Sequence, residues 1–525
     1  MVYSELRDFA YKARGDELRN YAAQLLKQDP NLVHEADSLE LVAFLVDTDF
    51  AGAEAKLETL QFKYSNSPQS QQIISTSNLV RSHLNFAFGR FEALQINVEE
   101  ELKSFESGIS KIEVADILQM LRLSSQKDLI LNDFVSLSRI AKMLEKSLNS
   151  EDKDQAFYLR NSILAMTRAS EGEHRKALEL ANKNIKIAEQ NNYTGILFPF
   201  DSLYVKAISL MAMALPQESL LVFEKLKSES LKYEQWPWYY LADGYFSREL
   251  AINNKLPEAL SIIREERELI SKMNLQNELS FFPDSSELFI RYLIKDIERI
   301  EILTNRLPNT ILVQQIRALK EEWNGRDMLE WIKSLPESTA RERIYKLVAL
   351  ADYFSDRESV AVDYMQQALK LVEETGAIEF LLRQHKLFDI IIKAAHQLST
   401  PFTEDIARRI TDRARENQQN RSGSIPVPLT TRELEVIRHL ATGKPISAIS
   451  EALHVSMNTM KTHLRNIYRK LDVDGRESAV EPLNGRLPER PMGADCKSAG
   501  SAFEGSNPSS TTKAQKCVAF MVALF

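Results

Sequence analysis

The sequence of 525 residues contains only two cysteines, and both lie within the last 30 residues. This scarcity excludes a disulfide framework, a cysteine metal cluster and a thiol nucleophile from the rest of the chain. The chain also lacks a run of the roughly 18 to 20 apolar residues that a membrane span needs, and its first residues carry charges where a signal peptide has an apolar core. We therefore expect a cytoplasmic protein with no membrane partner.

Proline and glycine are scarce as well, with 17 and 16 residues respectively. Leucine, alanine, glutamate, lysine and glutamine are abundant, so the composition favours helix along nearly the whole chain. The formal net charge is −8, which excludes a molecule that coats nucleic acid over its entire surface. We therefore predict an all-α protein in which any affinity for DNA is confined to a local basic surface.

The common motifs of enzyme active sites are missing from the sequence. There is no Walker phosphate loop, no HExxH and no GxSxG, and Gly443-Lys444 lacks the upstream glycine and the strand that a phosphate loop requires. The alternating strand and helix pattern of a phosphate-accepting receiver domain is absent too. Five histidines show no metal-ligand spacing and are assigned no role: His34, His83, His174, His385 and His396. We expect no enzyme activity, no catalytic residues, no cofactor and no metal site.

A repeated pattern occupies the first half of the chain. A small residue followed by an apolar residue opens an amphipathic segment of about three turns, and these segments recur every 40 to 43 residues. The small residues are Ala53, Ala93, Ser136, Ala177, Ser219 and Ala259. A second helical stretch precedes most of them, so each period predicts one helix pair whose backbones approach closely at the small residue. The pattern weakens after residue 275 and returns from Arg341 to Gly376.

This pattern is similar in architecture to tetratricopeptide-type repeats, although its period is longer and the full signature is absent. We expect residues 1–414 to form a TPR-like α-solenoid that senses or binds a partner, because repeat solenoids bind more often than they catalyse. The aromatic cluster at residues 236–240 is interpreted as packing between helices rather than as a ligand cage. Residues 415–428 lose apolar periodicity and gather polar residues and two prolines, which predicts a linker.

Residues 429–481 carry the signals of a small domain of short helices. Thr430 can cap a first helix and Glu433 can reach back to its start, while Leu429 and Leu434 stand at the positions of a hydrophobic staple. The predicted buried stripe of this helix is Leu434, Ile437, Leu440 and Ala441, and it ends at Gly443. A second helix runs from residue 446 to residue 453 and is expected to add three residues to the core: Ile449, Ala452 and Leu453.

A third helix follows a turn at residues 454–455, and Ser456 can cap it. Its apolar face is Met460, Leu464, Ile467, Tyr468 and Leu471, at helical spacing. The remaining surface has four positive charges and no acidic residue between residues 456 and 470. Such a run also occurs on helices that are merely solvated, and the order of the surrounding residues decides between the two interpretations. A helix-turn-helix motif is placed at residues 447–466.

The order LTxRELEVIxxLAxG, IxxxL and VSxxTxKxHLxNIYxKLxVxxR resembles the LuxR-type helix-turn-helix domain over about 50 residues. The resemblance implies a four-helix domain that binds double-stranded DNA. It places Lys461, Thr462 and Arg465 at base edges in the major groove. Thr459, Asn466 and Arg469 are better placed for phosphates. Asn458, on the same helix surface, completes the expected DNA-binding set.

The end of the chain departs from the LuxR-type pattern. A fourth helix, which commonly forms the dimer contact in such domains, begins at residues 476–481, but Pro482 stops it. Residues 482–525 are rich in glycine, serine and proline and lack helical periodicity, so we expect disorder. Two origins stay open for this tail: a natural flexible extension, or an aberrant reading frame through a transfer RNA gene after an insertion or a frameshift.

The sequence thus predicts a bacterial transcriptional regulator similar to the large MalT-like regulators without their ATPase module. Its solenoid would bind a protein or small-molecule effector, and a homodimer would place two recognition helices on neighbouring half-sites. The alternative is a repeat-based adaptor for protein interactions whose DNA-binding domain is impaired by the altered C-terminus.

Overall fold

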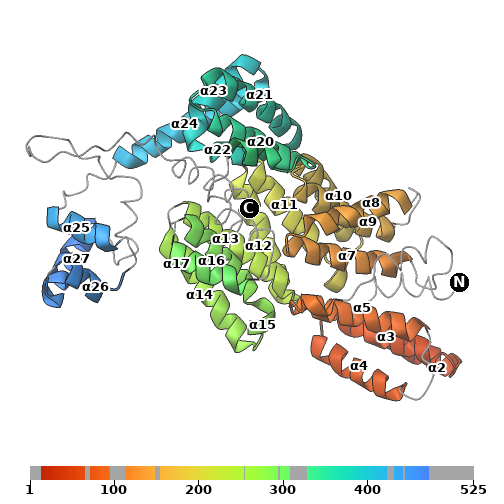
Figure 1. Cartoon of the computed structure of the whole chain (residues 1–525). Helices are drawn as coiled ribbons and strands as arrows, with labels where there is room; N and C mark the ends of the chain where they lie inside the picture. Colours follow the sequence, from red (N-terminus) through yellow and green to blue (C-terminus); the bar gives the residue numbers. More distant parts are fainter. Residues whose placement is uncertain are drawn as a thin grey trace, which may run out of the picture.

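The computed structural model describes residues 14–64, 71–94, 114–147, 154–253, 255–293, 296–307, 328–422, 431–440, 444–453 and 455–471. All regular elements in these ranges are helices, which confirms the all-α prediction (Figure 1). The predicted tail at residues 482–525 lies outside the described residues. One helical window, Gly195–Ala212, is apolar enough to cross a membrane, but 78% of it is buried inside the fold. It is therefore a core helix by its burial.

Successive helices pair along the first part of the chain. They are α2 (Gly15–Gln28), α3 (Val33–Val46), α4 (Phe50–Lys63), α5 (Gln71–Ala87), η1 (Phe91–Ala93), α7 (Val114–Ile130), α8 (Phe134–Ser147), α9 (Asp154–Ser170), α10 (His174–Gln190), η2 (Gly195–Leu197), α11 (Phe200–Ala212), α12 (Pro216–Lys232), α13 (Trp236–Ile252), α14 (Leu256–Lys272), α15 (Gln276–Leu279), α16 (Phe281–Leu293) and α17 (Ile297–Arg306). Within each repeat, α9 packs on α10 and α11 on α12, while α10 also contacts α11 of the next repeat. This is the stacking of helix pairs that the 41-residue pattern predicts.

A second group of helices follows. It comprises α19 (Met328–Ser334), α20 (Ala340–Tyr353), α21 (Glu358–Thr375), α22 (Ile378–Leu382), η3 (His385–Leu387), α23 (Phe388–Leu398) and α24 (Pro401–Ser422). Their apolar residues form a core of their own, which joins Ile332 to Ile410. The first core runs from Leu41 to Phe282. The two groups of helices meet where α21 and α22 contact α10 and α11 (Figure 1).

The small residues of the repeat pattern are fully buried in four of the six periods. Ala53, Ala177, Ser219 and Ala259 are each the fourth residue of a helix and are fully buried. In the other two periods the expectation is wrong by one residue, because the buried residues are Leu94 and Leu137. Ser136 lies near the start of α8 and is not fully buried. Its hydroxyl donates to the Asp133 carboxylate at 2.7 Å.

The turn inside each helix pair repeats the same backbone geometry. A residue with positive φ stands at its centre at Thr48, Gly89, Asn132, Gly172 and Ala214. The next residue then donates its N–H to the carbonyl five residues back, as from Asp49 to Phe44 at 2.9 Å. This is the hydrogen bond of a Schellman ending, which satisfies carbonyls at the end of a helix. The turn recurs with the same period as the buried fourth residue, so backbone and side-chain patterns agree.

The aromatic cluster at residues 236–240 belongs to the core of the repeats, as the sequence predicts. Trp238 and Tyr240 are each 1% exposed. Tyr240 lies against Phe282 with ring centroids 6.0 Å apart, and Trp238 lies near Tyr204 at 5.5 Å. These rings pack successive helix pairs together.

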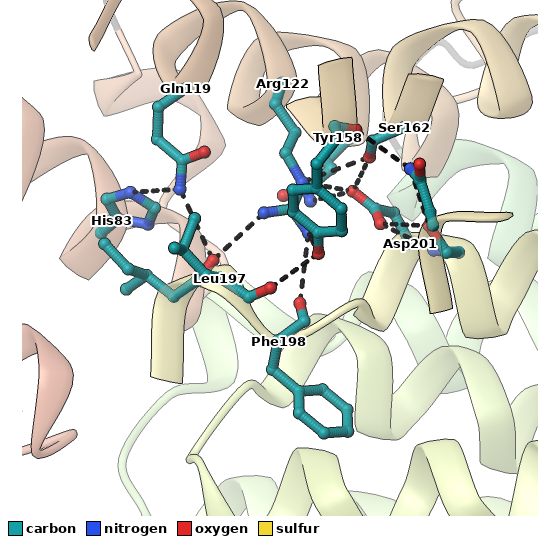
Figure 2. A network of polar contacts seen from close by, with 12 residues as sticks. His83, Gln119, Arg122, Tyr158, Ser162, Leu197, Phe198 and Asp201 are labelled. Carbon is teal, nitrogen blue, oxygen red and sulfur yellow. Dashed lines mark hydrogen bonds and ion pairs between the residues drawn. The ribbon is translucent and has the colours of Figure 1, made fainter. Parts of the chain in front are cut away.

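A buried polar network ties three repeats together (Figure 2). Arg122 of α7 donates through Nε to the Asp201 carboxylate of α11 at 2.6 Å, and Gln126 donates to the same carboxylate at 2.8 Å. The Arg122 guanidinium also donates to the Phe198 carbonyl, at 3.2 Å, and the Tyr158 hydroxyl donates to the Leu197 carbonyl at 2.6 Å. The network therefore fixes the segment before α11 against α7 and α9.

This network keeps its charges ionised in spite of complete burial. Burial opposes the ionisation of Asp201, but the Arg122 guanidinium and further hydrogen bonds hold the pKa of its carboxyl below the ordinary value. Nearby, burial and the Arg122 charge lower the pKa of His83 to about 3, so its ring is neutral at pH 7. The Gln119 amide nitrogen lies 3.4 Å from His83 Nε2. The ion pair of Arg122 and Asp201 therefore organises the polar groups of this region.

Helix α24 differs from the prediction at its end. Thr403, Ile406 and Ile410 are fully buried in the second core, as expected for the end of the solenoid. The helix then continues to Ser422, so the first eight residues of the predicted linker at 415–428 are helical. Without apolar periodicity this part of the helix has no apolar face to bury. Its glutamate, glutamine and arginine residues still have a high helix propensity, so the helix continues. Residues 423–428 of that prediction lie outside the described residues.

Candidate nucleic-acid interface

Three short helices surround a small apolar core near the C-terminal end of the described chain. They are α25 (Thr431–Leu440), α26 (Ile446–Ala452) and α27 (Met457–Leu471), and each contacts the other two (Figure 1). Their buried residues are Val436, Ile437, Leu440, Ile449, Leu453, Met460, Leu464 and Ile467. The sequence predicts all of these except Val436. The fourth helix of the expected domain lies outside the described residues.

One predicted core residue is wrong. Ala452 is exposed, and Ser450 is buried in its place. A helix of only seven residues buries one narrow face, and Ile449 and Leu453 already occupy it at i and i+4. The Ser450 hydroxyl satisfies its polar atom by donating to the Ser447 carbonyl at 2.7 Å. A buried serine one turn after an exposed one carries no apolar signal, which is why periodicity misses it.

The turn between α26 and α27 has the predicted cap. The Ser456 hydroxyl accepts the Thr459 N–H at 3.1 Å, which satisfies one of the free donors at the start of α27. The Val455 N–H donates to the Ser450 carbonyl at 3.0 Å and closes the end of α26. Two hydrogen bonds therefore close the end of α26 and the start of α27 on either side of the turn. The predicted cap Thr430, the staple residue Leu429, Ala441 and Gly443 lie outside the described residues.

The predicted DNA-binding residues face away from the core. At about 100° per residue, Met460, Leu464 and Ile467 share one side of α27. On the same count Thr462 and Arg465 lie on the opposite side, and Lys461 lies on the flank next to them. The structure agrees, because the first three are buried while Lys461, Thr462 and Arg465 are exposed. Thr459 is exposed beside them.

Three further predicted residues stand on α27 at positions that continue this face. Asn458 falls one turn before Lys461 and Thr462, Arg469 one turn after Arg465, and Asn466 on the flank shared with Thr459. Their side chains lie outside what the structure describes. The backbone of α27 therefore brings all seven positions to one half of the helix surface, and four of their side chains are exposed on it.

The exposed half of α27 is basic. Lys461 and Arg465 are its described charged residues, Arg469 and Lys470 follow in the sequence, and no acidic residue lies between Ser456 and Lys470. Among the described residues neither Lys461 nor Arg465 forms an ion pair. An α-helix with its side chains is about 10–12 Å across, which fits the roughly 12 Å width of the DNA major groove. The charge of these side chains is therefore available to a polyanion.

Comparison with known proteins assigns this part of the chain. Residues 427–482 match the family of bacterial regulatory proteins known as the luxR family, or GerE. The chain is 36% identical to the transcriptional regulatory protein LiaR of Bacillus subtilis over 112 residues, which are 21% of this chain and 52% of that protein. It is 33% identical to the probable transcriptional regulatory protein NarL of Mycobacterium tuberculosis over 149 residues, which are 28% of this chain and 65% of that protein.

A third relative is larger. The HTH-type transcriptional regulator MalT of Vibrio campbellii is 30% identical over 116 residues, which are 20% of this chain and 12% of that protein. The chain thus spans about half the length of LiaR and a small part of MalT. The capped turn, the eight-residue core and the basic face of α27 coincide with the matched segment. Residues 427–482 of this chain therefore form a LuxR-family helix-turn-helix domain.

Proposed function

We propose that the protein is a cytoplasmic transcriptional regulator that binds specific sites on double-stranded DNA through α27. The observation that carries the proposal is the exposure of Lys461, Thr462 and Arg465 on the surface of α27 that its buried residues leave to solvent. An arginine there can pair bidentately with guanine, and a lysine can serve a base edge or a phosphate. Thr459, Asn466 and Arg469 flank them at positions suited to the backbone phosphates.

The domain organisation belongs to the same proposal. Residues 1–414 act as the region that senses a protein or small-molecule effector, and residues 429–481 act as the DNA-binding domain. The helical repeats support this division, since stacked helix pairs present extended binding surfaces. A homodimer would place two copies of α27 on neighbouring half-sites about one helical turn apart. We propose no enzymatic step, because the chain offers a binding architecture and no catalytic motif.

Operator selection followed by a binding titration tests the proposal. The purified full chain is used to select binding sites from random duplex DNA, and the affinity for the selected site is then measured. We expect Lys461→Ala with Arg465→Ala to weaken specific binding by roughly 10² to 10⁴-fold, since each good base contact contributes about 1–3 kcal/mol. The slope of the logarithm of affinity against the logarithm of salt concentration should fall by up to about two, because up to two fewer counterions are released.

A matched control removes the same charge elsewhere. Lys183→Ala with Lys186→Ala changes two exposed lysines of α10 and should leave the affinity for the site within about twofold. If both double variants lose affinity equally, α27 does not read the site. If the unaltered chain selects no sequence while its helical repeats are folded, the adaptor for protein interactions becomes the better description.

A further inference from the structure

A cavity of about 180 Å³ lies where the two groups of helices meet. Helices α9, α10, α11 and α13 line it from the first group, and α20 and α22 line it from the second. Its size is close to that of an engineered 150 Å³ cavity that holds benzene. It is small beside the usual 300–1,000 Å³ of drug-sized pockets. The cavity therefore has room for a compact ligand of one ring or a short branched chain.

The charged groups of the lining include three arginines and two glutamates: Arg248, Arg341, Arg383, Glu249 and Glu379. Both glutamates are engaged, since Arg383 donates to Glu249 at 2.9 Å and to Glu379 at 3.0 Å. The lining thus carries one positive charge more than negative. A cationic ligand would meet repulsion here, and an anionic ligand would meet attraction.

Arg341 is the cation best placed to meet a ligand. Its guanidinium donates to the Ala169 carbonyl at 3.0 Å and lies 5.1 Å from the centre of the Phe134 ring. Among the described residues no carboxylate lies within ion-pair distance of it. Arg248, across the cavity, lies 5.6 Å from the Tyr245 ring centre. The Arg341 guanidinium has further N–H donors besides the one bound to the Ala169 carbonyl, and a guanidinium can form two parallel hydrogen bonds with a planar carboxylate.

The rest of the lining is aromatic or neutral. Tyr204, Tyr245 and Tyr345 supply rings, which favour a flat or apolar ligand body. His174 is 8% exposed, and its Nδ1 has no hydrogen-bond partner among the described residues. Burial and the charge of Arg341 lower the pKa of His174 to about 3, so its ring is neutral. The His174 ring therefore adds no charge to the lining.

We propose that this cavity binds a small carboxylate with an aromatic or compact apolar body, and that this ligand is the effector of the repeats. The inference rests on the proposed sensing function. Arg341 binds the carboxylate, Arg248 adds to the positive potential, and the tyrosines enclose the body. A nucleotide or an oligosaccharide is too large for the cavity, and a metal ion would find both carboxylates already paired.

The cavity is connected to the helix that leaves the repeats. Glu379 accepts from Arg383 and also from Arg413 of α24, at 3.2 Å. Arg341 joins the two groups of helices, because its own N–H donates to the Glu171 carbonyl at 2.9 Å. A carboxylate in the cavity competes with Glu379 for the neighbouring arginines and so alters the contact of Glu379 with α24. Occupation of the cavity is therefore transmitted to the C-terminal end of the repeats.

Calorimetry on the full chain tests the proposal with three probes: benzoate, phenylacetate and cyclohexanecarboxylate. Each is compared with its neutral amide, which has nearly the same shape. We expect at least one acid to bind in a one-to-one ratio with a Kd between roughly 10 µM and 1 mM, a range that a ligand of about ten atoms can reach. Its amide should bind at least tenfold more weakly. If none of the acids binds, or if acid and amide bind equally, the proposal is overturned.

Variants identify the cavity as the site. Arg341→Gln should weaken binding of the acid at least tenfold and bring it close to that of the amide. Arg343→Gln is the matched control, since it lies two residues away on α20 and is exposed. Circular dichroism reports whether Arg341→Gln folds, and Arg248→Gln replaces it if it does not. An equal loss in Arg343→Gln, or no loss at either cavity arginine, contradicts the assignment.

The two proposals fail in different ways. Binding of the probes is measured without DNA, and binding of DNA is measured without the probes. If the chain binds its operator but none of the acids, the effector cavity is wrong and the regulator stands. If it binds an acid but selects no DNA sequence, the cavity stands and the proposed function falls.

Discussion

The core of the repeats and the core of the LuxR-family domain are built in opposite ways. The repeats bury a complete ion pair, Arg122 with Asp201, whose side chains are 2% and 0% exposed. The core of α25 to α27 consists of eight apolar residues, and its charges lie outside on α27. In the repeats two charged side chains are buried inside the fold, whereas in the small domain the charged side chains lie on the surface.

This difference predicts how the stability of each region responds to the substitution of a polar residue. A buried ion pair loses its hydration, and this cost is offset only if every hydrogen-bond partner is in place. The pair of Arg122 and Asp201 therefore depends on three helices at once. A displayed basic face depends only on the helix that carries it. The repeats should therefore respond strongly to a single polar substitution inside them, whereas the DNA-binding domain should keep its fold when its outer charges are removed.

The largest expected effect comes from breaking the buried pair. Asp201→Asn leaves the Arg122 guanidinium buried without a counter-charge and should lower the free energy of unfolding of the repeats by about 3–5 kcal/mol. Urea unfolding followed by tryptophan fluorescence measures it, since all four tryptophans precede residue 332. Replacing both partners, by Arg122→Met and Asp201→Leu, should cost less than the single change.

The surface pair Lys393 and Glu358 provides the control for that experiment. Their side chains are 51% and 61% exposed, so Lys393→Met should cost less than about 1 kcal/mol. If Asp201→Asn costs no more than Lys393→Met, the enclosed network does not stabilise the repeats and the contrast between the two regions fails.

A core truncation in the small domain should come next in size. Met460→Ala removes a fully buried side chain from a core of only eight residues and should cost about 2–4 kcal/mol. Because that core is so small, we expect this domain to unfold while the repeats stay folded. Hydrogen exchange of the α27 amides measures the change, and tryptophan fluorescence should not report it. Simultaneous loss of both signals would show that the two regions unfold together.

Acid should destabilise the repeats through their buried histidines. The pKa of His83 is lowered to about 3 in the folded chain by burial and by Arg122, against an ordinary value of 6.5. A histidine with a depressed pKa contributes stability above pH 6.5, and this is lost as the pH falls toward 3. From pH 6.5 to 5 the loss is about 2 kcal/mol.

The measurement compares the pH dependence of urea unfolding in the original chain and in His83→Gln, which should be flatter. His396→Gln is the control, because its ring is 58% exposed. A steeper acid dependence in the His83 variant would contradict the assignment of a neutral buried ring.

The smallest expected effect concerns the turn before α27. Ser456→Ala removes the hydroxyl that accepts the Thr459 N–H and should cost the small domain about 1 kcal/mol. Ser456→Asp keeps an acceptor and should restore most of this loss. Hydrogen exchange at the first turn of α27 measures it, and an unchanged exchange rate in Ser456→Ala would mean that the cap is replaced by water.

The two regions also differ in how far the sequence predicts them. Local signals define α27, because the cap at Ser456, the spacing of Met460, Leu464 and Ile467 and the basic face between them lie within one stretch of chain. The repeats show their period in the same way. The buried pair of Arg122 and Asp201 joins residues 79 positions apart, and no periodicity indicates that these two charges meet.

The errors in the prediction have a common cause. The sequence predicts a close helix contact at Ser136 and a core position at Ala452, because both are small and stand near apolar residues. The structure buries Leu137 and Ser450 instead. Small residues fit both a close helix contact and an exposed position, so composition alone does not decide. The left-handed turn residues Asn132 and Gly172 would have fixed the register, since each helix begins two residues after them.

Helix α24 extends beyond the residues that anchor it in the second core. With 22 residues it is about 33 Å long, and its base is packed by Ile406 and Ile410 and tied to Glu379 by Arg413. The nine residues beyond Arg413 extend about 14 Å, so a tilt of about 15° there would displace the end of the helix by about 3.5 Å. That is close to the distance of about 3.4 Å between successive base pairs. A change too small to disturb any helix pair can therefore shift the point where the chain leaves the repeats by a distance that matters on DNA.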